Sequence, residues 1–127
     1  MIFLFGNGIS RDKMSETIYK IVTPEQWGEA SNTGIFKGAP IDLADGYIHF
    51  STAEQVVETT EKHFKGKGQL FLLAFESEIF GDALKWEPSR GGALFPHLYA
   101  DLDPALCVAK YELVECDDGS HLFPETF

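Results

Sequence analysis

The sequence predicts a single α+β domain with several strands and two main helices. Its 127 residues are enough for one domain with its own hydrophobic core. Two segments carry helix start signals, and short segments rich in β-branched and aromatic residues lie between and after them. Eleven phenylalanines indicate either an aromatic-rich core or a ligand pocket with aromatic walls.

The patterned part of the chain begins with a strand and a helix. Residues 17–22, which read TIYKIV, are β-rich and predict the first strand. The sequence TPEQ at residues 23–26 combines a Thr cap, a Pro at the first helical position and a Gln at the capping-box position. The helix that starts here is expected to end near residues 32–34, with Trp27 as a core anchor.

A turn-rich loop and a short strand follow. The loop, residues 34–46, contains three Gly and one Pro, and it is either an ordinary connection or a cover over a pocket. The strand runs through DGYIHFST at residues 45–52, where apolar and polar side chains alternate. One face carries Ile48 and Phe50, and the other carries Tyr47, His49 and Ser51.

A second helix is predicted from about Thr52 to Phe64. The sequence STAE at residues 51–54 fits a capping box, in which the Ser51 hydroxyl satisfies a free amide of the first turn. Strand ends that lead into helix N-termini are common sites for anionic ligands. Ser51 is therefore either a cap alone or also a ligand contact. The face expected to pack inward consists of Ala53, Val56, Val57, Thr60 and Phe64.

The second half of the chain predicts mainly strands. Residues 69–76 form a continuous apolar run, which is typical of a central strand covered on both faces. A short strand is expected to end at Glu87, before a Gly-rich loop that carries Arg90, and residues 95–99 return as an extended segment. The last strand is predicted at residues 108–115.

The domain is thus expected to span residues 17–116. Residues 1–16 precede it as an N-terminal extension without a clear pattern. Residues 117–127 follow it as an acidic C-terminal tail with a loose end.

Composition argues against several classes of function. The net charge is −10 and no run of Lys and Arg exists, so we expect no nucleic-acid binding. No apolar stretch has the length of a membrane span or a signal-peptide core, so we expect a cytoplasmic protein without membrane contact.

Cys107 and Cys116 would lie about 30 Å apart in one extended strand, beyond disulfide reach, which favours a reducing compartment. The histidines form no HExxH motif or close doublet, and no bound metal is expected.

Seven polar residues of these segments could form one small-molecule site. Imidazoles act as acids or bases near neutral pH, and a carboxylate stabilises positive charge on a neighbouring carbon. Arg binds a phosphate through two hydrogen bonds, and a Tyr ring stacks on a flat ring. The candidate catalytic residues are His49, Glu87 and His97, and the candidate ligand-binding residues are Asp45, Ser51, Arg90 and Tyr99.

Each of these residues also has an ordinary structural interpretation. Glu87 and Arg90 could form an exposed ion pair worth under about 1 kcal/mol. His97 could be a structural histidine, and His49 a half-buried sheet residue bonded to a carbonyl. Whether these side chains meet in space decides between the two interpretations.

The sequence resembles a small bacterial and plant family catalogued as domain of unknown function 952. The resemblance extends from about Ile18 to Val114. It is most specific in the DGYIHFST block at residues 45–52 and the FPHLY block at residues 95–99. Residues 18–21, Trp27 and Gln55 also belong to it.

That family is grouped by fold with the ADP-ribosyltransferase superfamily, whose members bind NAD in a cleft. The resemblance implies an ADP-ribosyltransferase-like α+β fold: a split, bent antiparallel-rich β-sheet with two main helices. It further implies that His49 and Ser51 hold a ribose, that Glu87 orients the nicotinamide ribose, and that Tyr99 stacks on nicotinamide. The chain lacks a clear Ser-Thr-Ser block and the multiple-Arg set of the RNA 2'-phosphotransferases.

We therefore expect an ADP-ribosyltransferase-like protein that binds NAD or a related ADP-ribose nucleotide in a cleft lined by His, Ser and Glu. It would cleave or transfer at the ribosyl carbon, with NAD as a substrate and no permanently bound cofactor. Two alternatives stay open: a non-catalytic nucleotide- or protein-binding module of the same fold, and an enzyme that acts on another small metabolite. The sequence does not indicate an oligomeric state.

Overall fold

The computed structural model describes residues 16–127, without the side chain of Arg90. Of the extension predicted at residues 1–16, residues 1–15 lie outside the described residues. Short 3₁₀ turns occupy Ser77–Ala83, Arg90–Gly92 and Pro104–Leu106. The helices and longer elements, in chain order, are β2 (Thr17–Val22), α2 (Pro24–Thr33), α3 (Pro40–Asp45), β3 (Ile48–His49), α4 (Ala53–Phe64), β4 (Leu70–Glu76), β5 (Leu84–Pro88), β6 (Leu94–Leu98), β7 (Ala109–Glu115) and β8 (His121–Leu122).

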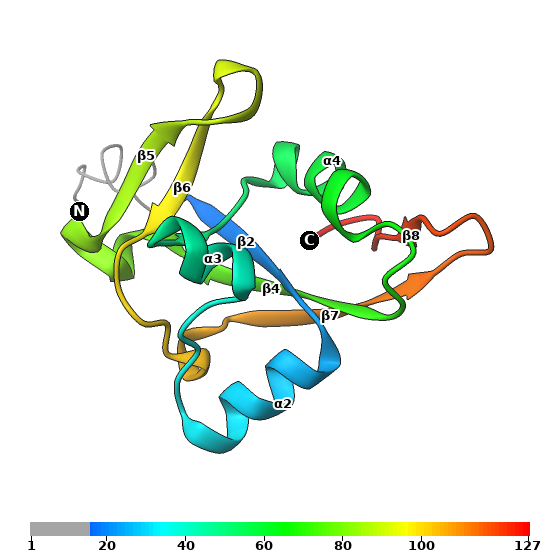
Figure 1. The fold of residues 1–127 in the computed structure, drawn as a ribbon, viewed down its shortest axis with the longest axis horizontal. Coiled ribbons are helices and arrows are strands. Elements are labelled where there is room, and N and C mark those ends of the chain that lie inside the picture. The colour runs from blue at the N-terminus through cyan, green and yellow to red at the C-terminus, as the bar shows by residue number, and fades with distance from the viewer. Residues whose placement is uncertain (1–15) are drawn as a thin grey trace, which may run out of the picture.

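The described strands form two antiparallel sheets, which confirms the α+β class. The larger sheet has the order β2-β4-β7-β8 and the smaller has the order β3-β6-β5. Tyr19 of β2 and Ser51 join them, because each backbone N–H donates to the other's carbonyl at 2.8 and 2.9 Å. The β5–β6 hairpin of the smaller sheet extends beyond α4, as Figure 1 shows.

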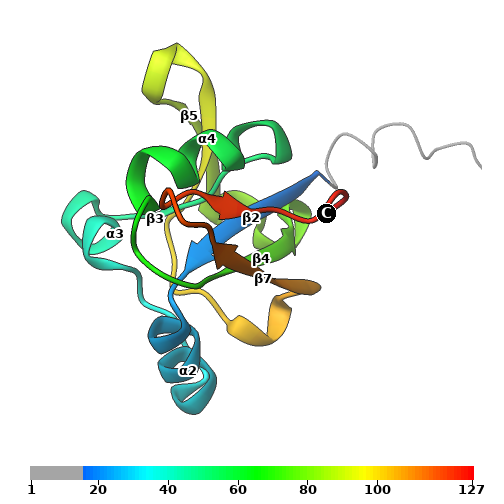
Figure 2. The same cartoon turned by 90° about the vertical axis from the view of Figure 1, so that its right-hand side faces the viewer.

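The pair of β2 and β4 is buried on both faces, as predicted for residues 69–76. Alternation along β4 directs Leu70, Leu72 and Ala74 to one face, and Leu73 and Phe75 to the other. Helices α2 and α4 lie on opposite sides of this sheet in Figure 2. Each face therefore has its own apolar cluster. Both clusters contain aromatic rings, which agrees with an aromatic-rich core, one of the two interpretations of the phenylalanine count.

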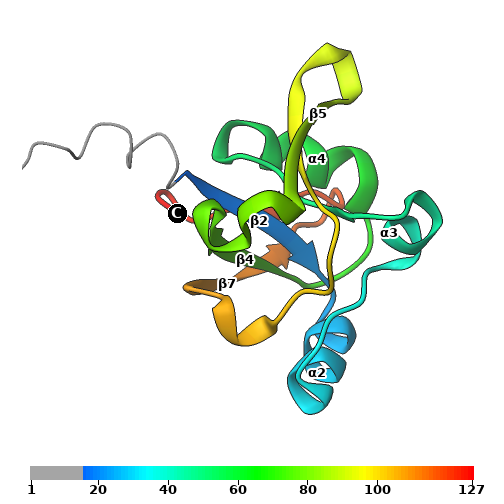
Figure 3. The same cartoon turned by 90° about the vertical axis from the view of Figure 1, so that its left-hand side faces the viewer.

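The smaller sheet and α3 lie beside the larger sheet (Figure 3). Residues 40–45 form a helix where a loop was predicted, so that prediction was wrong for these residues. Pro40 occupies the first turn, and the Asp42 carboxylate accepts from the Ala39 N–H at 2.8 Å. Gly46 ends the helix with φ +89°, a left-handed conformation that favours glycine. These local signals were hidden by the Gly- and Pro-rich composition of the segment.

The start of α4 differs from the prediction by one residue. Thr52, not Ser51, is the N-cap, and its N–H donates to Gln55 Oε1 at 3.0 Å. Ser51 is 4% exposed and donates to Thr59 Oγ1 at 3.2 Å. The inward face is also narrower than expected, since Val56 and Thr60 are buried but Val57 is 41% exposed.

The C-terminal segment is part of the fold, so the prediction of a loose end was wrong. β8 pairs with β7 through Val114 opposite Leu122. The Phe127 ring packs edge-to-face on Tyr19, with ring centroids 5.3 Å apart. Phe123 and Phe127 pack against the apolar cluster on the α4 side of the sheet, and burial of their apolar surface stabilises this segment.

The capping box of α2 can be tested by substitution. Gln26 N–H donates to Thr23 Oγ1 at 3.1 Å, and Thr23 N–H donates to Gln26 Oε1 at 2.9 Å. We expect Thr23→Ala to lower the free energy of unfolding by about 1 kcal/mol, because an amide of the first turn loses its acceptor. Urea denaturation measures the change. The exposed substitution Glu29→Ala in the same helix is the control, with a change under about 0.5 kcal/mol, and equal effects of the two would contradict the assigned cap.

Candidate functional site

His49 and His97, which are far apart in the sequence, lie side by side. They are paired across β3 and β6, and their ring centroids are 5.5 Å apart. His49 is partly exposed, whereas His97 is 2% exposed. The two blocks that carry the family resemblance thus meet at one point of the smaller sheet.

The Tyr47 ring lies between the two imidazoles and Tyr99. It stacks on the His97 ring with centroids 4.1 Å apart and an interplanar angle of 26°. The centroid distances from Tyr47 to His49 and to Tyr99 are 4.7 and 5.2 Å. Tyr47 was predicted to share a face with His49, but no role was predicted for it. Its period-two spacing from His49 was the signal that could have included it.

Glu87 reaches this cluster from β5, the strand next to β6. Its Oε1 lies 2.7 Å from His97 Nδ1 and accepts from the Tyr99 hydroxyl at 2.8 Å. The hydrogen bonds from His97 and then Tyr99 lower the pKa of Glu87 below its usual range. The same bond to Glu87 raises the pKa of Tyr99. Glu87 is therefore an ionised carboxylate at neutral pH.

The other side of the cluster is formed by two carboxylates of α3. Asp42 Oδ1 lies 2.6 Å from His49 Nδ1, and Asp45 Oδ2 lies 2.9 Å from His49 Nε2. Carboxylates only accept hydrogen bonds, so both contacts are hydrogen bonds when both ring nitrogens of His49 carry a proton. The ordinary interpretation of His49, a bond to a neighbouring carbonyl, is not what the structure shows.

A buried ion pair between Lys20 and Asp42 contacts His49 on the protein-interior side. Lys20 Nζ lies 2.9 Å from Asp42 Oδ2 and donates to the His49 carbonyl at 2.8 Å. Burial lowers the pKa of Lys20, and the neighbouring Asp42 opposes this shift. Sequence analysis gave no role to this pair. The spacing along β2 was a signal for this pair. Lys20 lies two residues from Ile18 and from Val22, which are both buried, so all three side chains share one inward face.

Asp42 is the most strongly stabilised carboxylate of the cluster. Burial acts to raise its pKa, but the hydrogen bond with His49 and the charge and hydrogen bond of Lys20 together lower it to about 2. Asp42 also accepts from the backbone N–H groups of Ala39 and His49. The side chain therefore joins β2, α3 and β3.

The pKa of Asp42 predicts loss of stability in acid. Its pKa is about 2 in the folded protein against an ordinary 3.8, so unfolding binds protons between these values. The contribution, about 2 kcal/mol, is complete above about pH 4 and is lost as the pH falls through about 2. Urea denaturation of wild type and Asp42→Asn at a series of acidic pH values tests this. The difference in stability between the two proteins should shrink as the pH falls, and a constant difference would contradict the assignment.

One of the seven predicted site residues is not brought into the cluster. The Ser51 hydroxyl is buried against Thr59, so its predicted contact with a ligand has no support from this geometry. The side chain of Arg90 lies outside the described residues. The five that come together are Asp45, His49, Glu87, His97 and Tyr99.

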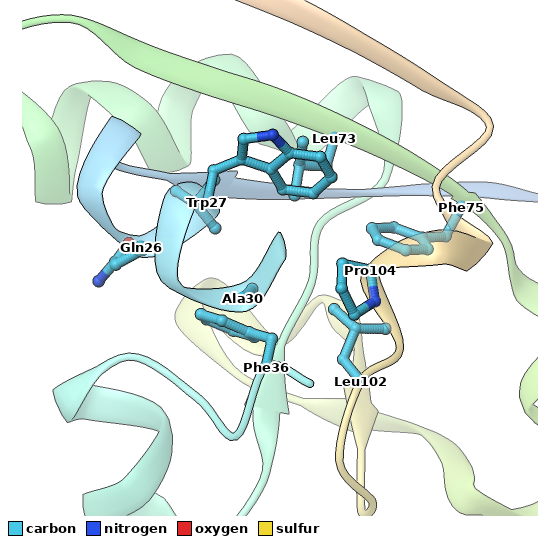
Figure 4. Close-up of a pocket in the computed structure, with 9 residues that line it drawn as sticks. Gln26, Trp27, Ala30, Phe36, Leu73, Phe75, Leu102 and Pro104 are labelled. Atoms are coloured by element: carbon cyan, nitrogen blue, oxygen red, sulfur yellow. The ribbon is translucent and has the colours of Figure 1, made fainter. Parts of the chain in front are cut away.

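Two cavities among the described residues lie away from this cluster. One is a small apolar pocket between α2 and the sheet, with Trp27, Phe36 and Phe75 in its wall (Figure 4). Its volume of about 10 Å³ has room for about one water molecule. The other is an open groove of about 350 Å³ beside Trp86 and Ser77. The residues around His49 and His97 instead form a partly exposed face.

Between Glu16 and the C-terminus, no group of three or more His, Cys, Asp or Glu side chains could hold a metal ion. Within the same range, no helix has both the length and the apolar character that crossing a bilayer requires.

The family model described as "Protein of unknown function (DUF952)" matches residues 21–109, a range that includes both histidines of the cluster. The chain belongs to this family. Its fold is similar to solved structures of the protein CC0527 from Caulobacter crescentus. A crystal structure is 46% identical, has a TM-score of 0.81, and the alignment covers 84% of this chain and 93% of that one. A solution NMR structure of the same protein is 47% identical, with a TM-score of 0.73 and coverage of 82% and 90%. No curated protein matches the chain.

Proposed function

We propose that this member of the DUF952 family has an ADP-ribosyltransferase-like fold and binds NAD or a related ADP-ribose nucleotide. The binding site would be the face formed by Asp45, Tyr47, His49, Glu87, His97 and Tyr99, called the His–Tyr face below. The observation that carries the proposal is the meeting of two imidazoles, two phenol rings and two carboxylates from three separate chain segments. Small-molecule sites are commonly assembled in this way.

The accessible groups of the His–Tyr face suit a ribosyl ligand with an aromatic base. Tyr99 is 44% exposed and can stack on a flat ring. The Glu87 carboxylate, whose side chain is 35% exposed, can accept a hydrogen bond from a ribose hydroxyl. The ionised Glu87 would also stabilise an oxocarbenium-like ribosyl carbon while the bond to nicotinamide breaks. In that step the bond between the ribosyl carbon and nicotinamide breaks and its electrons leave with nicotinamide. The oxygen of an acceptor hydroxyl or water forms the new bond to the carbon and releases its proton to solvent.

His97 would act through its neighbours. Its ring is buried beneath Tyr47 and bonded to Glu87. We propose that it orients the carboxylate, while His49 and Glu87 contact the ligand. The non-catalytic binding module remains the second candidate, because both ring nitrogens of His49 already lie against carboxylates. Neither nitrogen is therefore a free base.

Stabilisation by ligands tests the nucleotide proposal. A ligand at a hundred times its dissociation constant should raise the free energy of unfolding by about 2.7 kcal/mol. We expect this for NAD or ADP-ribose in a thermal denaturation series. His49→Ala should abolish the stabilisation, and His63→Ala, an exposed histidine of α4, should keep it.

Release of nicotinamide from NAD would then separate an enzyme from a binding module. The absence of stabilisation by both nucleotides at millimolar concentration would overturn the proposal, and binding that survives His49→Ala would overturn the assigned site.

A further inference from the structure

We infer that Lys20 and Asp42 are positioning residues for His49, and that the Asp45 carboxylate marks the position of an acceptor oxygen of the ligand. The inference rests on the proposed function only for the identity of that ligand. The geometry concerns the ring of His49 and the four groups around it.

The buried pair holds His49 at three atoms. Lys20 Nζ donates to the His49 carbonyl at 2.8 Å, the His49 N–H donates to Asp42 Oδ1 at 3.1 Å, and Nδ1 lies 2.6 Å from the same oxygen. Backbone and ring are thus tied to one carboxylate. The ring orientation that results directs Nε2 away from Asp42 and towards Asp45.

Stability alone does not explain a buried ion pair between Lys20 and Asp42. The side chains of Lys20 and Asp42 are 7% and 1% exposed. Removing two charges from water is so costly that well-packed apolar residues often serve stability as well or better. Precise orientation of a hydrogen-bond donor, in contrast, requires a rigid partner with fixed oxygens. The structure therefore assigns the pair to the orientation of His49.

Asp45 makes a contact of a different kind. Its side chain is 41% exposed, and it is the last residue of α3. The C-terminal end of a helix is unfavourable for a carboxylate, and solvent screens the pair with Nε2. A ligand oxygen can replace this carboxylate without disturbing the buried bonds to Asp42. The contact with the Asp45 carboxylate requires a donor at Nε2, so a ligand group in this place must accept, which selects a carboxylate, phosphate or hydroxyl oxygen.

Nitrogen-15 NMR of the histidine rings, in protein labelled with ¹⁵N-histidine, tests both parts. In wild type, the Nδ1 proton of His49 should exchange slowly with solvent because it is held in a short, part-buried contact with the Asp42 carboxylate. Its rapid exchange would overturn the positioning role, whatever happens to any variant. Asp42→Asn should move the Nδ1 resonance and broaden the ring signals, and an unchanged His49 spectrum in this variant would also overturn it.

Asp45→Ala tests the marked position. In this variant we expect the His49 Nε2 resonance to move from its wild-type value. Titration with acetate, used as the probe, should return it to that value. The acetate dissociation constant should be lower than in wild type by about fivefold, which corresponds to an exposed pair worth about 1 kcal/mol. Inorganic phosphate and ribose titrated separately distinguish the oxygen types. Asp101→Ala, an exposed control, should respond to acetate as wild type does.

The outcomes separate this inference from the proposed function. If acetate, phosphate or ribose restores the Nε2 resonance but no nucleotide binds, the inference stands and the nucleotide proposal falls. If a nucleotide binds but none of the three probes moves Nε2 in Asp45→Ala, the inference falls and the nucleotide proposal stands.

Discussion

Asp42→Ala is expected to lower the free energy of unfolding by about 3–5 kcal/mol, because it leaves the Lys20 ammonium buried without its partner charge. The substitution also removes the acceptor for the N–H groups of Ala39 and His49. Both the ion pair and the start of α3 are lost together. Guanidinium or urea denaturation at neutral pH measures the change from the midpoint and slope.

Two aspartates provide matched controls for this prediction. Asp45→Ala removes only a partly exposed contact with His49 and should cost under about 1 kcal/mol. Asp101→Ala is exposed and should change stability by under about 0.5 kcal/mol. A loss at Asp42 no larger than that at Asp45 would show that the pair is not buried in solution.

Phe75→Ala is expected to cost about 3–5 kcal/mol, because it opens a cavity at the centre of the α2 side of the core. Phe75 is fully buried, and its ring packs edge-to-face on Phe50 with centroids 5.7 Å apart. Its ring also lies 6.1 Å from that of Phe80. The same denaturation experiment measures the loss.

Ile79→Ala is the control for Phe75. Ile79 lies on the surface at 46% exposure, so its truncation should change stability by under about 0.5 kcal/mol. If Phe75→Ala cost no more than Ile79→Ala, the aromatic cluster would not form the core that the structure shows.

Local patterns explain which elements were predicted correctly. β2 and β4 were predicted because an apolar run and β-branched residues determine strands when both faces become buried. α2 was predicted because TPEQ satisfies its own free amides within one turn. These signals act between residues close in the chain, where the sequence can be read directly.

The incorrect predictions depend on partners far along the chain. α3 was predicted to be a loop. Its buried residue Asp42 accepts hydrogen bonds from Lys20, which lies 22 positions earlier in the chain. β8 has two residues and no strand signal of its own, and it forms because β7 offers an open edge. Ser51 was predicted to be the N-cap of α4. Its backbone instead pairs with Tyr19 of β2, a contact that the local sequence does not show, and the N-cap is Thr52, one residue later.

For the site, the sequence alone determined the chemical groups: imidazoles, carboxylates and phenol rings at strand ends, and the two blocks that place the chain in its family. Only the tertiary structure decided that β3 pairs with β6, which brings His49 beside His97, and that Lys20 and Asp42 lie beneath them. The physical reason is that burial of apolar surface selects the sheet pairing over the whole chain at once. The polar groups that this pairing encloses must then find charged or hydrogen-bonding partners wherever the fold places them.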